Sequence, residues 1–236
     1  MHRGSIAGMR GADLLTWLAE VKPEARDAAV EEHLGIASSP PSFAPPGDHL
    51  IGYHASGVAS IVRALLEVPV VPDDVVVDLG AGLGKVVVLA RLLTGATARG
   101  IELQPALVDR AREAAARLGV DVHFTRGDAR EVELDDGTVF FLYVPFTGPA
   151  LMDVLGRLHA IAARHAIVVC ALGIELGREA PWLAPRSTDS FWLTIYDSVL
   201  PGVSPRANRG PSPLVSDLAD AIAFERMARC DRLQRT

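Results

Sequence analysis

The stretch "VVVDLGAGLGKVVVLA", residues 75–90, decides the fold class of this chain. An apolar run ends at an acid, passes through a turn with glycine at every second position, and continues as another apolar run. A strand, a glycine-rich turn and a helix in this order form the first part of a βαβ unit, and the start of the helix offers free backbone N–H groups to an anion. The turn therefore predicts a site for a small anionic or nucleoside-bearing molecule.

The rest of the chain continues the alternation of strands and helices. Further strand-like runs are "ATARGIEL" (96–103), "VHFTRG" (122–127), "VFFLYV" (139–144) and "AIVVCAL" (166–172). Helical patterns separate them, except at 128–137, which is short for a helix, so we expect a loop or a single turn there. A last run, "FWLTIYDS" (191–198), follows without a convincing helix, which is typical of a hairpin. We therefore expect an α/β fold: a doubly wound, Rossmann-like seven-stranded sheet, mostly parallel, with an antiparallel closing hairpin.

The expected domain organisation has three parts. Residues 1–47 carry two short helical patterns and then a proline-rich loop, and we interpret them as an N-terminal extension. Residues 48–200 form the ligand-binding domain. Residues 201–236 read as a loop followed by a helix from about 213 to 233.

Composition and charge limit the partners and the compartment. The chain has 236 residues, 49% of them hydrophobic and 22% charged, and its net charge is -6. The late arginines between 206 and 235 alternate with acids and are interpreted as a solvated helix face or tail. We therefore expect no nucleic acid partner, and a small-molecule or protein side-chain acceptor instead. No signal-peptide pattern or membrane-length apolar run is present, so we expect a cytoplasmic protein without membrane contact.

The cysteines and histidines indicate neither a disulfide framework nor a metal site. Cys170 falls inside an apolar run and is interpreted as a core residue, while Cys230 is far away in the sequence. No His/Cys grouping has the spacing of metal ligands, so no metal is expected.

Three ligand classes compete for the glycine turn. A phosphate-binding P-loop would need glycine at Leu79 and a hydroxyl at Val86, and both requirements fail. A dinucleotide fingerprint would need its third glycine at Lys85. The remaining pattern, D-x-G-x-G-x-G, starts at Asp78 and suits a ligand that carries both an amino acid and a nucleoside. S-adenosylmethionine is such a ligand.

Through "VVDLGAGLGK" the chain resembles the class I S-adenosylmethionine-dependent methyltransferases, over roughly residues 50–200. The resemblance implies that Glu102 holds the ribose hydroxyls, and that Asp128 and the backbone N–H of Ala129 meet the adenine. The implied cofactor-binding set is Asp78, Gly80, Ala81, Gly82, Gly84, Glu102, Leu103, Asp128, Ala129 and Tyr143. The flank 52–90 is also similar to the Dot1-like branch of protein-lysine methyltransferases, which by itself assigns no protein substrate.

The residues after the fourth strand, Tyr143-Val144-Pro145-Phe146, are expected to line the pocket for the methyl acceptor. Amino-methylating relatives often show (Asn/Asp)-Pro-Pro-(Tyr/Phe) here, and Tyr143 takes the place of the amide or carboxylate. This departure counts against nucleobase N-methylation and leaves O-methylation, other amines and lysine side chains open. The catalytic candidates are Tyr143, His54 and Tyr53, with His54 a possible base. A half-buried strand-end aromatic and an ordinary loop histidine are the structural alternatives.

Two other functions stay open at the level of the sequence. A nicotinamide-dependent oxidoreductase would use a Tyr-x-x-x-Lys pair, but none of Tyr53, Tyr143 and Tyr196 has a lysine four residues later. A non-catalytic sensor or partner protein would keep the cofactor site without chemistry. Lys85 is unusual at a helix start, where the helix dipole disfavours a cation, so we expect it to pair with a nearby acid or with the cofactor carboxylate.

Overall fold

The computed structural model describes residues 6–36, 50, 55–143, 146–187, 193–207, 209 and 212. The predicted C-terminal helix and Cys230 lie outside these residues. No helix in the described part is both long and apolar enough to cross a membrane.

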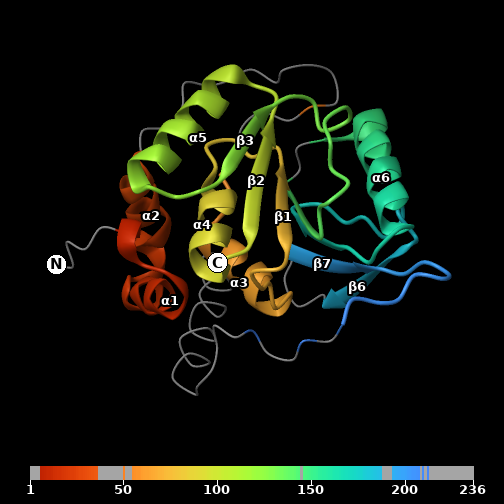
Figure 1. Ribbon diagram of the computed structural model, residues 1–236, viewed down its shortest axis with the longest axis horizontal. Helices are drawn as coiled ribbons and strands as arrows, with labels where there is room; N and C mark the ends of the chain where they lie inside the picture. Colours follow the sequence, from red (N-terminus) through yellow and green to blue (C-terminus); the bar gives the residue numbers. More distant parts are fainter. Residues whose placement is uncertain are drawn as a thin grey trace.

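A seven-stranded sheet forms the centre of the molecule (Figure 1). Its spatial order is β3-β2-β1-β4-β5-β7-β6. Strands β1 to β5 pair in parallel, and β7 is antiparallel to both β5 and β6, which confirms the predicted fold. The strands are β1 (Val75–Leu79), β2 (Thr97–Glu102), β3 (His123–Arg126), β4 (Val139–Tyr143), β5 (Val168–Leu172), β6 (Leu183–Ser187) and β7 (Leu193–Ser198).

Helices cover both faces of the sheet, with α6 on one side and α1 to α5 on the other (Figure 1). Alternation along β4 serves both layers: Val139 and Phe141 pack with the larger helical layer, and Phe140 and Leu142 pack with α6. The helices are α1 (Gly11–Glu20), α2 (Arg26–Leu34), α3 (Val58–Glu67), α4 (Lys85–Thr94), α5 (Pro105–Leu118) and α6 (Gly148–Ala162). The segment 128–137 contains turns and no helix, as predicted.

The N-terminal helices are part of the main core. Leu14, Leu18 and Leu34 are fully buried in the same apolar cluster as Leu89 of α4. Arg117 of α5 also donates a hydrogen bond to the carbonyl oxygen of Leu34 at the end of α2. Burial of these leucines therefore contributes to the stability of the layer that carries the glycine turn.

Candidate cofactor and active site

The glycine turn joins β1 to α4 and sits where the strand order reverses between β1 and β4. Gly80, Gly82 and Gly84 have φ angles of 90°, 53° and 83°, in the left-handed region that favours glycine. A Cβ atom on Gly84 would lie 2.5 Å from Cζ of Phe124, so packing also requires a glycine there. Crevices at such a switch point are the usual ligand sites of open α/β sheets.

Glu102, the last residue of β2, stabilises this turn by accepting hydrogen bonds from backbone N–H groups. Its Oε2 accepts a hydrogen bond from the N–H of Gly82 at 2.9 Å, and its Oε1 accepts one from the N–H of Gln104 at 2.9 Å. A carboxylate oxygen has a second acceptor position, so both oxygens can still accept from neighbouring hydroxyls. The acid is therefore available for a ribose while it shapes the turn, a second role that the sequence did not reveal. Leu103 follows it and is half-buried.

Asp78 is a buried carboxyl, 4% exposed, near the end of β1. Burial, and then the negative charge of Glu102, raise the pKa of Asp78 to about 8. Its side chain has no hydrogen-bond partner among the described residues. A buried carboxyl without a partner beside a glycine turn fits an ammonium group, which would donate to it and favour its ionised form.

The loop after β3 holds the two residues expected to meet the adenine. The carboxylate of Asp128 accepts from Nε of Arg130 at 3.0 Å and from Nη2 at 2.6 Å, and these hydrogen bonds lower the pKa of Asp128. Ala129 is buried, and its N–H donates to no atom of the described residues. That N–H fits a ring nitrogen acceptor, whereas Asp128 is partly engaged by Arg130.

Arg157 of α6 binds this loop, which packs against the same apolar cluster as α6. Its Nη1 donates to the carbonyl oxygen of Ala129 at 2.8 Å, and its Nη2 donates to that of Val132 at 2.6 Å. Arg157 was not predictable from the sequence, because a single arginine on a helix carries no local signal of the carbonyl groups that it will contact.

Lys85 pairs with acids of the N-terminal extension, the first of its two expected roles. Its Nζ lies 2.9 Å from Oδ1 of Asp27 and 2.6 Å from Oε1 of Glu31, both on α2. The same Oδ1 accepts a hydrogen bond from the N–H of Val58 at 3.0 Å, at the start of α3. The four-residue spacing of Asp27 and Glu31, which places both on one helix face, was the available signal for this cluster.

The residues expected to line the pocket for the methyl acceptor lie only partly within the described residues. Tyr143 ends β4, is half-buried and packs against the apolar core. Phe146 is buried and forms an isolated antiparallel bridge with Leu50, so Leu50 lies beside the segment that follows β4. Tyr53 and His54 themselves lie outside the described residues.

The sheet brings most of the predicted residues to one edge. Leu79 of β1 pairs with Ile101 of β2 on one side and with Leu142 of β4 on the other. The carboxyl ends of these strands, which carry Asp78, Glu102 and Tyr143, therefore meet around the glycine turn. Within the described part of the chain, no group of three or more His, Cys, Asp or Glu side chains could hold a metal ion.

Comparison with known proteins shows which proteins this chain resembles. The family model described as "Methyltransferase domain" matches residues 76–165. An RNA methyltransferase from Salinibacter ruber, solved with S-adenosyl-L-homocysteine, is 30% identical, and the match covers 65% of this chain and 98% of that one with a TM-score of 0.51. The PH1948 protein from Pyrococcus horikoshii is 17% identical, with 72% of this chain and 98% of that one covered and a TM-score of 0.52, which supports the fold alone.

A curated relative matches a shorter stretch. The 23S rRNA (uracil(1939)-C(5))-methyltransferase RlmD from Bordetella pertussis is 37% identical over 110 residues, which make up 44% of this chain. The matched stretch is only 23% of that protein.

The chain belongs to the class I S-adenosylmethionine-dependent methyltransferases, and S-adenosylmethionine is its methyl donor. Because this is a family of enzymes, neither the oxidoreductase nor the sensor interpretation holds.

The expectation that nucleic acid is excluded as a partner is wrong. It rested on the net charge of -6 and on the absence of a basic cluster. The relatives from Salinibacter ruber and Bordetella pertussis are RNA methyltransferases by name. Net charge sums the whole surface, whereas contact with a phosphate backbone depends on the charges near the site.

Proposed function

We propose that this enzyme transfers the methyl group of S-adenosylmethionine to a nitrogen or oxygen atom of an RNA molecule. The observation that carries the proposal is the 30% identity to the Salinibacter ruber RNA methyltransferase over 98% of its chain. The cytoplasmic location expected from the sequence stays a prediction.

Among the described residues, the cysteine chemistry favours a nitrogen or oxygen acceptor over carbon, and Cys230 lies outside these residues. Carbon 5 of a pyrimidine is a weak nucleophile unless a thiolate first adds to the neighbouring carbon of the ring. Cys170 is the free cysteine of the described residues, and it is fully buried in the middle of β5. Burial raises the pKa of its thiol, so Cys170 cannot supply the thiolate.

Exposed arginines near the carboxyl edge of the sheet are candidates for phosphate contacts. Arg126 and Arg130 lie at and just after the end of β3, and Arg178 lies in the loop after β5. All three are exposed, on the edge to which the glycine turn belongs. Such residues position a nucleic acid backbone without reading its sequence.

The proposed roles follow the geometry of the site. Asp78 would accept from the ammonium group of the cofactor, Glu102 from its ribose hydroxyls, and Ala129 would donate to its adenine. S-adenosylmethionine supplies an electrophilic methyl group on a sulfonium, and the protein must align the acceptor behind that methyl. Tyr143 stands at the end of β4, where it would line the acceptor pocket, and Tyr53 and His54 stay predictions as proton acceptors.

The test is methyl transfer from labelled S-adenosylmethionine to RNA and to protein extract, compared between wild type, Glu102→Ala and the exposed-acid control Glu113→Ala. Digestion of the RNA to nucleosides and mass spectrometry would identify the modified atom. We expect an N- or O-methylated nucleoside that is lost in Glu102→Ala and kept in Glu113→Ala. A 5-methylpyrimidine product would refute the nitrogen or oxygen assignment, and label found in protein alone would refute RNA as the acceptor.

A further inference from the structure

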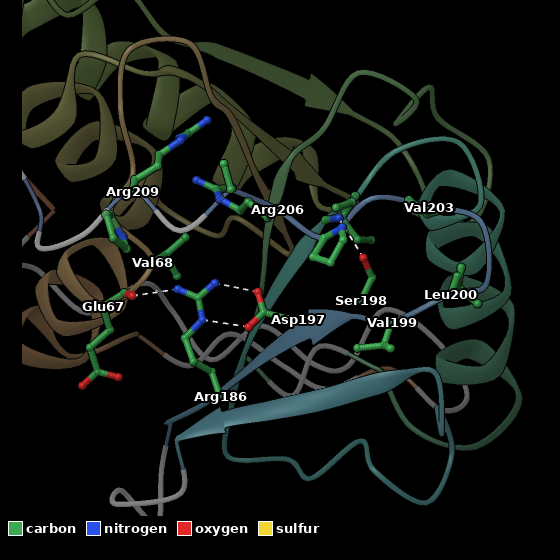
Figure 2. Close-up of a pocket in the computed structure, with 15 residues that line it drawn as sticks. Glu67, Val68, Arg186, Asp197, Ser198, Val199, Leu200, Val203, Arg206 and Arg209 are labelled. Carbon is green, nitrogen blue, oxygen red and sulfur yellow. Dashed lines mark hydrogen bonds and ion pairs between the residues drawn. The ribbon is translucent and has the colours of Figure 1, made fainter.

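A cavity lies beside the end of α3, β6 and the end of β7, and Figure 2 shows the residues that line it. Its volume is about 500 Å³. It is lined by the end of α3, by Ile167 before β5, by Ser198 at the end of β7, and by several residues between 199 and 207 together with Arg209. These positions are at the amino ends of the parallel strands, whereas Asp78 and Glu102 are at the carboxyl ends, so the two sites are separate.

The positive charge of one arginine in this cavity, Arg186, is balanced by a neighbouring carboxylate. Arg186 of β6 donates from Nε to Oδ2 of Asp197 at 2.8 Å and from Nη1 to the carbonyl oxygen of Glu67 at 2.8 Å (Figure 2). Arg186 and Asp197 therefore form a neutral pair on the wall.

The other two guanidinium groups share one carboxylate. Arg206 donates from Nη2 to Oδ2 of Asp74 at 2.7 Å, and Arg209 donates from Nη1 to the same oxygen at 2.6 Å. Asp74 is 2% exposed and also accepts from the N–H of Val71 and the hydroxyl of Thr138. These two arginines were expected on a solvated tail, and the structure instead places them beside a buried acid.

This arrangement leaves positive charge next to the cavity. Arg206, Arg209 and Asp74 together carry one net positive charge. Burial lowers the pKa of Arg206; the charge of Asp74 opposes this shift and the charge of Arg209 adds to it. Among the described residues, only one nitrogen of each guanidinium has a partner, so further N–H donors are available. Planar guanidinium groups with spare donors suit the oxygens of a phosphate.

The rest of the lining is largely apolar. Its side chains include Val68, Pro69, Val199, Leu200, Val203 and Pro205. We propose that this cavity binds a phosphate monoester with a flat or apolar body, as a nucleoside monophosphate has, with the phosphate on Arg206 and Arg209 and the body against the apolar wall. The monoester could be a free nucleotide or the terminal nucleotide of an RNA chain, and the inference does not depend on the proposed methyl acceptor.

The test is calorimetric titration of the full chain with adenosine monophosphate at constant ionic strength. Saturating S-adenosylhomocysteine keeps the nucleotide out of the cofactor site. We expect adenosine monophosphate to bind more tightly than inorganic phosphate, and adenosine to bind far more weakly than either. A short RNA with a 5′ phosphate, compared with the same RNA ending in a 5′ hydroxyl, distinguishes the two sources of the monoester.

Two variants test the position of the anion. Arg209→Gln removes one donor, and Val203→Glu adds a carboxylate to the lining without removing any hydrogen bond described above. Each should weaken binding of adenosine monophosphate by about tenfold or more. Arg164→Gln, which removes an exposed charge in the turn after α6, is the matched control and should bind as wild type.

Binding of the nucleotide at this cavity can be distinguished from binding at the cofactor site. S-adenosylhomocysteine should bind equally well to all of these proteins, because none of the changes touches the glycine turn. The proposal is overturned if wild type binds neither the nucleotide nor phosphate at millimolar concentration. It is equally overturned if Arg209→Gln and Val203→Glu both bind the nucleotide as wild type does.

Discussion

Nζ of Lys85 lies 2.6 Å from Oε1 of Glu31 and joins the helix after the glycine turn to the N-terminal helix α2. The lysine side chain is 5% exposed and the glutamate side chain 25%, so water only partly screens the pair. With Asp27 the lysine makes a second pair, and Asp27 in turn binds the start of α3. Three helices therefore meet at one buried cation.

Lys85→Met should lower the free energy of unfolding by about 1–2 kcal/mol, because it leaves two partly exposed carboxylates without their cation. Chemical denaturation measures the change. Lys22→Met, at the other lysine of the chain and exposed, should change stability by less than about 0.5 kcal/mol. A double-mutant cycle with Glu31→Gln should show coupling, and a coupling energy near zero would mean that the aliphatic stem of Lys85 supplies the whole effect.

Glu102→Ala should weaken S-adenosylhomocysteine binding by about a hundredfold, because it removes the acceptor of the Gly82 and Gln104 amides as well as the expected ribose contact. Glu102→Gln keeps one acceptor oxygen and should fall between that variant and wild type. Calorimetric titration checks the order, with Glu113→Ala on the exposed face of α5 as control. Equal affinities in Glu102→Ala and Glu113→Ala would remove Glu102 from the site.

Binding of S-adenosylhomocysteine should release a proton near neutral pH. The pKa of Asp78 is raised to about 8, so its carboxyl is mostly protonated at pH 7, and an ammonium partner would drive it to the ionised form. The affinity should therefore rise with pH between about 6 and 8 and then level off. Titration in buffers of different ionisation enthalpy counts the released proton, and Asp78→Asn should abolish the release.

Asp78 also determines the sign of the pH dependence of protein stability when no cofactor is added. Because the folded pKa of Asp78 lies above the ordinary value of 3.8, the folded state binds more protons than the unfolded state between these values. The contribution of Asp78 to stability is therefore full in acid and is lost as the pH rises toward 8. Thermal unfolding of wild type and Asp78→Asn across this range would contradict the assignment if their difference did not change with pH.

Cys170→Ala should leave the rate of methyl transfer within about threefold of wild type, because the thiol is buried away from the carboxyl edge and its pKa is raised by burial. Its cost should appear in stability instead, at about 1 kcal/mol for a small cavity in the core. Parallel measurement of activity and unfolding separates the two. Loss of turnover in a folded, cofactor-binding variant would restore a thiol mechanism.

Local chemistry made much of the fold and of the cofactor edge predictable. The glycine spacing and apolar runs of 75–90 specify a strand, a left-handed turn and a helix from local sequence alone. Glu102 and Asp128 were predictable as candidates because each follows a strand-like run, and carboxyl ends of parallel strands share one edge. Their roles toward the cofactor remain predictions.

Long-range partners were not predictable in the same way. Lys85 meets acids more than fifty residues earlier in the chain, and Arg206 meets Asp74 from 132 residues away. Such pairs are set by tertiary packing, which a local pattern does not encode. The exclusion of nucleic acid failed for a related reason, since a whole-chain charge says nothing of where the charges lie.

The buried ion pairs of Lys85 also limit whether the glycine-turn segment can be transplanted into a related protein. The family match begins at residue 76, yet the apolar cluster on that side of the sheet already includes Ile6. A chimera that transplanted residues 75–90 into a relative without the acids of α2 would carry an uncompensated lysine into an apolar layer. The glycine-turn segment and helix α2 must therefore be transplanted together, or Lys85 must first be replaced by a small residue.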